Sequence, residues 1–101
     1  MNTDDALLLH AKYYKDIIME AEELYKRGDN DLLAGLQLID LEWANIQLGQ
    51  KHAAALREVS CAAARLTSDY IAPLVLTIRQ HPQERIQWLE NAVEAGGYGC
   101  D

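Results

Sequence analysis

Apolar residues recur at alternating intervals of four and three along the first quarter of the chain. Charged residues occupy the opposite side, and the apolar stripe consists of Leu7, Ala11, Tyr14, Ile18, Ala21 and Tyr25. This 3.6-residue period is typical of an amphipathic helix with one buried face. Lys26 and Arg27 suit the negative end of a helix dipole, and Gly28 can close the helix in a left-handed conformation. We therefore predict a helix over about residues 4–27.

A second apolar stripe begins only a few residues later. It consists of Leu32, Leu36, Ile39, Trp43 and Ile46, and the pattern weakens from Gly49 onward. The helix is therefore predicted to span about residues 30–50. Because so short a connection forces neighbouring helices to run antiparallel, the first two helices are predicted to form a hairpin.

The two prolines mark the remaining boundaries. A third helical stretch is predicted over residues 54–79, with a kink or break near 68–73, because Pro73 removes a backbone hydrogen bond and clashes with the preceding turn. Pro82 opens a last helix over 82–95, where its missing N–H costs nothing. The expected buried stripe of this helix is Ile86, Leu89 and Val93, with Trp88 and Ala92 on its flank. No β-strand pattern occurs.

Composition and charge exclude several classes of partner. A chain of 101 residues with 50% hydrophobic and 25% charged residues is expected to be one folded domain. Its net charge is −7, and its 9 Lys and Arg residues are thinly spread. A surface that binds phosphates needs clustered basic residues, so neither nucleic acid nor an anionic membrane is an expected partner.

Cysteine usage and the N-terminal sequence predict a cytoplasmic location. The chain has 2 cysteines without CxxC spacing, which give no disulfide framework, and Cys61 is interpreted as a small buried residue. The first ten residues lack the basic region and long apolar run of a signal peptide. No stretch approaches the roughly 18 apolar residues of a membrane-spanning helix.

The sequence lacks the familiar motifs of metal-binding, catalytic and nucleotide-binding sites. His10, His52 and His81 fall on different predicted elements without HxxxH or HExxH spacing, and no Glu is followed by His three residues later. The chain also lacks GxSxG and GxxxxGK[ST] sequences. Glu22 and Glu23 are interpreted as a solvated face. We therefore expect no enzyme activity and no catalytic, metal-binding or cofactor-binding residues.

Polar residues interrupt the apolar stretch LIDLEWANIQ, residues 38–47. Glu42 and Asn45 fit two interpretations. They are part of the ordinary alternation around a helix, or one of them is partly buried and bonded to a neighbouring helix end, which would fix the register of the hairpin. The sequence leaves both interpretations open.

Two segments resemble one family. Residues 38–55, LIDLEWANIQLGQKHAAA, are similar to the stretch that follows the nucleotide-binding module in signal-transducing NTPases of the STAND class and related bacterial regulators. That stretch opens an array of tetratricopeptide-like helix hairpins. Residues 81–96, HPQERIQWLENAVEAG, look like a helix that follows in those proteins. The resemblance implies a sensor or scaffold segment, and it implies no ATPase activity.

We therefore predict a single all-α domain over residues 1–101, with four or five helices in antiparallel hairpins. The expected arrangement is a right-handed, tetratricopeptide-like array, and a compact helical bundle is the alternative. Because stacked hairpins leave a concave surface, the expected function is protein binding, as an adaptor or as a sensor-arm segment of a bacterial signalling protein. The alternatives are a small oligomeric structural protein and a helical-bundle enzyme or metal carrier.

The expected partner is another protein or a neighbouring domain of a larger protein. The residues expected to line the concave surface are Tyr13, Tyr14, Gln37 and Trp43. The last helix is expected to leave an open edge around Trp88, covered by a second copy of the chain or by further repeats, because its apolar residues span more than one narrow stripe.

Overall fold

Five helices account for most of residues 2–96, the part of the chain that the computed structural model describes. They are α1 (Thr3–Arg27), α2 (Asp29–Ala55), α3 (Cys61–Asp69), α4 (Val75–Arg79) and α5 (Pro82–Gly96). Residues 2–96 contain no β-strand. The all-α prediction is confirmed, whereas the tetratricopeptide-like arrangement of the hairpins stays a prediction.

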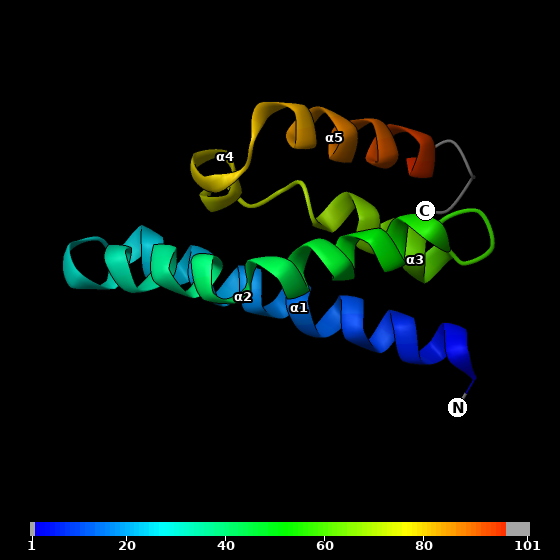
Figure 1. The fold of residues 1–101 in the computed structure, drawn as a ribbon, viewed down its shortest axis with the longest axis horizontal. Helices are drawn as coiled ribbons and strands as arrows, with labels where there is room; N and C mark the ends of the chain where they lie inside the picture. The colour runs from blue at the N-terminus through cyan, green and yellow to red at the C-terminus, as the bar shows by residue number, and fades with distance from the viewer. Residues whose placement is uncertain (1, 97–101) are drawn as a thin grey trace.

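The two longest helices, α1 and α2, lie side by side and antiparallel (Figure 1). Their connection is the single residue Gly28, whose φ of 77° lies in the left-handed region that a residue without a Cβ adopts easily. The backbones come very close at Gly35, where an ideal Cβ would lie 2.6 Å from the carbonyl oxygen of Ala21. A glycine at this position therefore permits the helix contact.

The second helix extends beyond the predicted range 30–50 and ends at Ala55, within the segment from Gly49 onward where the apolar pattern weakens. Gly49 is buried inside the helix. α3 then begins at Cys61 rather than near residue 54, because the Ser60 hydroxyl accepts a hydrogen bond from the Ala63 N–H at 3.2 Å and caps the helix. The chain breaks around Pro73, between the end of α3 at Asp69 and the start of α4 at Val75.

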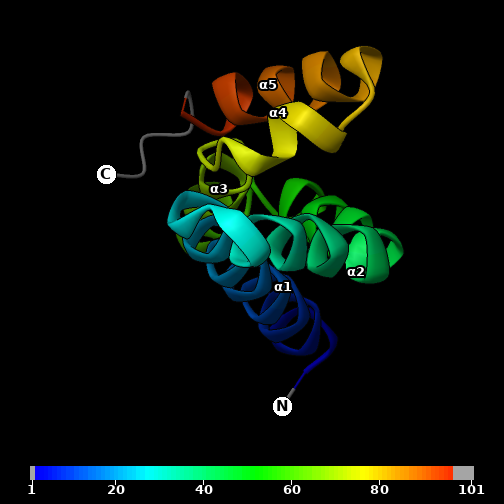
Figure 2. The ribbon, with the colours of Figure 1, turned by 90° about the vertical axis from the view of Figure 1, so that its left-hand side faces the viewer.

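The second half of the chain returns along the hairpin. α3 and α5 pack against each other, α4 connects them at one end, and α5 runs in the same direction as α2 (Figures 1 and 2). Arg79 at the end of α4 forms an ion pair with Asp40 of α2 at 3.2 Å. α5 therefore packs mainly against α3, which lies between it and the α1–α2 hairpin. It contacts α2 along one side only.

Tyr70, directly after α3, joins the helices at the centre of the core. Its side chain is fully buried, and its hydroxyl donates a hydrogen bond to the Ala11 carbonyl at 2.5 Å. Its ring meets Trp88 edge to face at 5.8 Å, and Trp88 stacks on Trp43 at 6.0 Å. Burial, and then the charge of Asp16, raises the pKa of Tyr70 above its usual range, so the hydroxyl remains a donor at neutral pH.

The remaining core consists mainly of small and β-branched side chains. Its fully buried members include Ala11, Ile18, Ala21, Ile39, Ile46, Ala53, Val75 and Leu76. Between residues 2 and 96, no helix is both long and apolar enough to cross a membrane.

Candidate interaction surfaces

The structure does not gather the five predicted interaction residues on one surface. Tyr13 is exposed on α1, and its ring lies 4.9 Å from the half-buried ring of Tyr14. Gln37 is exposed on α2. Trp43 is half-buried because it stacks on Trp88. Two pairs of neighbours therefore form, Tyr13 with Tyr14 and Trp43 with Trp88, and Gln37 joins neither.

Trp88 itself is not part of the open edge that was predicted on the last helix, although its neighbours Leu89 and Val93 are exposed. Trp88 is only 4% exposed and lies on the face of α5 that packs into the molecule, together with Ala92 and Ala95. The indole fits between Trp43 and Tyr70, so this bulky side chain is core rather than surface.

The residues that were expected in the core form the outer face of α5 instead. Ile86, Leu89 and Val93 are 55%, 39% and 77% exposed, and their spacing of three and four residues places them in one stripe. Together with Glu90 and Glu94 they line a shallow groove of about 350 Å³. A row of exposed aliphatic side chains with two carboxylates beside it is the kind of surface that binds the apolar face of a helix from another molecule.

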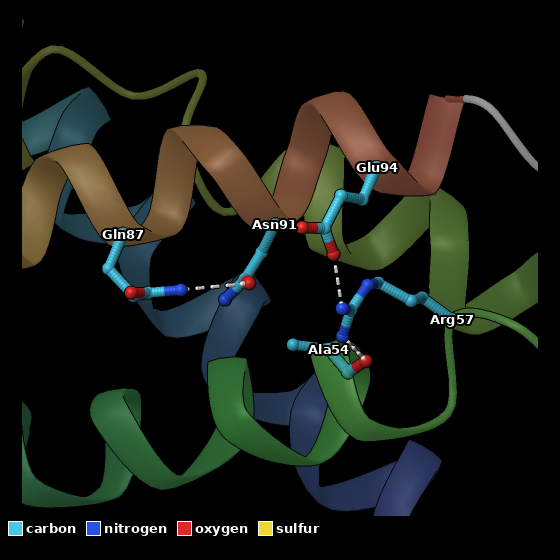
Figure 3. Close-up of polar contacts among 5 residues, drawn as sticks. All are labelled: Ala54, Arg57, Gln87, Asn91 and Glu94. Carbon is cyan, nitrogen blue, oxygen red and sulfur yellow. Dashed lines mark hydrogen bonds and ion pairs between the residues drawn. The ribbon is translucent and has the colours of Figure 1, made fainter.

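A second and larger hollow, the α2–α5 groove, lies between the C-terminal half of α2 and the inner side of α5. Its volume is about 520 Å³, and its lining residues are mostly polar: Gln47, Gln50, Lys51, Ala54, Ala55, Arg57, Glu84, Gln87, Trp88 and Asn91. Figure 3 shows Gln87, Asn91 and Glu94 descending from α5 toward Ala54 and Arg57.

Side-chain bonds cross the α2–α5 groove at two places. Gln47 donates to Glu84 Oε2 at 2.6 Å, while Arg57 bonds both to the Ala54 carbonyl and to the Glu94 carboxylate. Between these crossings, Gln87 Nε2 donates to Asn91 Oδ1 at 3.3 Å along α5 (Figure 3). This groove was not predicted from the sequence. Its only sequence signal is that glutamines and an asparagine recur every three or four residues on two separate helices.

Glu42 and Asn45 have different environments. Glu42 is half-buried and lies close to Tyr14 of α1, and the pKa of the Tyr14 hydroxyl is raised first by burial and then by the Glu42 charge. Asn45 is exposed and donates to Glu42 Oε2 at 3.3 Å within the same helix. The interpretation of a polar residue facing a neighbouring helix therefore fits Glu42 and not Asn45.

Helix pairing brings His10 and His52 together, which their positions in the sequence did not predict. Their ring centroids are 4.9 Å apart, and the Nδ1 atom of each is buried without a hydrogen-bond partner. Burial lowers the pKa of His52, and the charges of His10 and Lys51 lower it further. In the described part of the chain, no three His, Cys, Asp or Glu side chains are arranged to hold a metal ion.

Two single-residue interpretations are corrected as well. Glu22 is 3% exposed rather than solvated, and its Oε1 atom is buried without a partner. Cys61 is exposed at the first position of α3, and its sulfur is part of a disulfide, so it is not a small buried residue.

The two hollows thus differ in character. The outer face of α5 is aliphatic with acidic residues at its edge, whereas the α2–α5 groove is rich in carboxamides and contains residues of both charges. No model of a protein family, no curated protein and no solved structure matches the chain.

Proposed function

We propose that this chain is a non-enzymatic protein-interaction module that binds an amphipathic helix of another protein on the outer face of α5. The observation that carries the proposal is the exposure of Ile86, Leu89 and Val93 in one stripe. Helix-binding surfaces use apolar side chains at this spacing, because the partner helix presents its own apolar residues with the same period. Leaving three aliphatic residues in water has a cost that a partner would remove.

The charges beside the stripe favour a basic partner. Glu90 is exposed on α5, and the whole chain carries a net charge of −7. A helix with Lys or Arg beside its apolar face would pair with the Glu90 carboxylate, since that of Glu94 is paired with Arg57, and would associate faster. A second copy of the chain is the less favoured occupant, because it would bring the acidic residues of two chains to one contact.

Two broader parts of the proposal concern context. We propose that the module is an adaptor or the sensor arm of a bacterial signalling protein, supported by the resemblance of residues 38–55 and 81–96 to such segments. A cytoplasmic location is also proposed, although the disulfide at Cys61 favours an oxidising compartment. Fractionation of the producing cells decides between the two locations.

A matched pair of valine variants tests the proposed surface. Val93 on α5 and Val59 in the loop before α3 are equally exposed, at 77%. The probe is a labelled helical peptide of leucine and lysine, about 14 residues or four turns long. We expect Val93→Asp to weaken its binding at least about tenfold, which is 1.4 kcal/mol, and Val59→Asp to leave it unchanged. Fluorescence anisotropy measures both.

Two further measurements separate the alternatives. A leucine–glutamate peptide with the same apolar face is expected not to bind, because its charges repel Glu90 and the acidic chain. Equal effects of the two valine variants would show that binding of the probe does not depend on the outer face of α5, and would reject the proposal. Sedimentation of the wild type tests the rival function of a structural oligomer, which predicts a mass that rises with concentration and is reduced by Val93→Asp.

A further inference from the structure

The α2–α5 groove has two closed ends and an open middle. Gln47 and Glu84 bridge it at one end, and Arg57 and Glu94 bridge it at the other. Both bridges join residues 37 positions apart, so α2 and α5 run parallel and in register along the groove. Glu94 lies ten positions after Glu84 on α5, which corresponds to about 15 Å at 1.5 Å per residue.

Two residues that line the groove carry hydrogen-bonding groups without partners. Gln50 is 4% exposed, lines the groove, and has a buried Nε2 that meets no acceptor. Arg57 Nε is also buried without a partner, although the other two nitrogens of its guanidinium are bonded. A buried donor without an acceptor is costly, so both nitrogens favour a ligand that brings carbonyl oxygens into the groove.

The carboxamides on α5 complete a pattern that alternates donors and acceptors. The bond between Gln87 Nε2 and Asn91 Oδ1 leaves the Gln87 Oε1 acceptor and the Asn91 Nδ2 donor free for another molecule. Side chains four residues apart on a helix are separated by about 6 Å along the axis. Alternate residues of an extended peptide are about 6.6 Å apart, and their N–H and C=O groups recur with that period.

We propose that the α2–α5 groove binds an extended, uncharged segment of polypeptide through its backbone. About 15 Å accommodates four or five extended residues. The segment is uncharged because the groove and its end bridges balance, with Lys51 and Arg57 opposite Glu84 and Glu94, in a chain whose net charge is −7. Ala54 and Ala55 leave room beside the peptide for small side chains.

The test uses the blocked tetrapeptide acetyl-Ser-Ala-Ser-Ala-amide as a defined probe. Titrating it to about 10 mM into the ¹⁵N-labelled chain is expected to give saturable shifts of the side-chain amide signals of Gln50, Gln87 and Asn91, with a dissociation constant of the order of 1 mM. The same peptide with its backbone nitrogens methylated is expected to give weaker shifts, because it keeps its carbonyl acceptors but cannot donate to Gln87 Oε1. Absent shifts, or equal shifts from both peptides, would overturn the proposal.

Two asparagines provide a matched pair of variants. Asn91→Ala removes a groove donor and is expected to weaken probe binding about fivefold, the loss of one hydrogen bond. Asn45→Ala removes an exposed asparagine of α2 outside the groove and is expected to leave binding unchanged. Equal effects of the two variants would overturn the assignment.

Gln50 distinguishes a ligand-binding role from a structural one. Gln50→Leu removes the buried donor without a partner, and is expected to raise the melting temperature while weakening probe binding about fivefold. Unchanged probe binding by this variant would overturn the role of Gln50. The proposal does not depend on the outer face of α5, so Val93→Asp is expected to bind the tetrapeptide as the wild type does.

Discussion

At the scale of single residues, Gly49 of α2 lies so close to Tyr70 that no side chain fits between them. An ideal Cβ on Gly49 would lie 2.3 Å from the Tyr70 hydroxyl oxygen and 3.4 Å from the Ala11 Cα. Since the hydroxyl also donates to the Ala11 carbonyl, one tyrosine holds α1 and α2 in place from the end of α3. The absence of a side chain at residue 49 is therefore a packing requirement and not a helix break.

The Gly49–Tyr70 contact predicts coupled variants. Gly49→Ala is expected to destabilise the chain by about 1–3 kcal/mol through overpacking. Tyr70→Phe is expected to cost about 1 kcal/mol for the lost hydrogen bond. In the Tyr70→Phe background, Gly49→Ala should cost at least about 1 kcal/mol less, because the clashing oxygen is gone. Urea denaturation of the four chains measures the coupling, and purely additive effects would contradict this account of residue 49.

At the scale of elements, α5 is the helix whose buried face differs from the predicted one. It carries apolar residues on two faces, the stripe of Ile86, Leu89 and Val93 and the set of Trp88, Ala92 and Ala95. The more aliphatic stripe was predicted to be buried. The structure buries the other, because Trp88 finds two aromatic partners and the alanines allow close contact with α3.

This reversal predicts opposite sensitivities at adjacent positions of α5. Trp88→Ala removes a side chain that is 4% exposed and should destabilise the chain by about 3–5 kcal/mol. Leu89→Ala truncates a side chain that is 39% exposed and should cost no more than about 1 kcal/mol. Thermal and chemical denaturation compare the two directly. A larger loss of stability for Leu89→Ala than for Trp88→Ala would show that the aliphatic stripe, and not Trp88, is the buried face of α5.

Element boundaries show what local sequence can and cannot predict. The predicted ranges 4–27 and 82–95 lie within one residue of α1 and α5. Their boundaries are set by local residues: the basic residues and Gly28 end α1, and Pro82 begins α5. The close approach of Gly49 to Tyr70 joins residues that lie 21 positions apart. The α2–α5 groove depends on two helices separated by α3 and α4. Such distant contacts leave no periodic signal.

At the scale of the whole molecule, helix pairing decides which charges are buried together. His10 and His52 meet because α1 and α2 run antiparallel along their full length, and Glu22 is buried although its neighbour Glu23 is exposed. The chain is otherwise acidic, with a net charge of −7. Protonating a histidine reduces that net repulsion, which favours the folded state unless the histidine itself is held in its neutral form.

The pKa of His52 predicts how stability depends on pH. It is lowered in the folded chain, mainly by burial, while in the unfolded chain it lies near 6.5. The unfolded state therefore binds the proton more readily, so this contribution to stability is complete above about pH 6.5 and is lost as the pH falls below that value. We expect the free energy of unfolding of the wild type to decrease between about pH 7.5 and pH 5.5, against the effect of the net charge.

Two histidine variants separate the causes of that decrease. His52→Gln should remove it, because no group with a lowered pKa then remains at that position. His10→Gln should only reduce it, since burial is a larger cause than the charge of His10. Urea denaturation of the three chains at about pH 7.5, 6.5 and 5.5, spanning the unfolded pKa, gives the comparison. If His52→Gln lost as much stability on acidification as the wild type, His52 would not be the cause of the pH dependence.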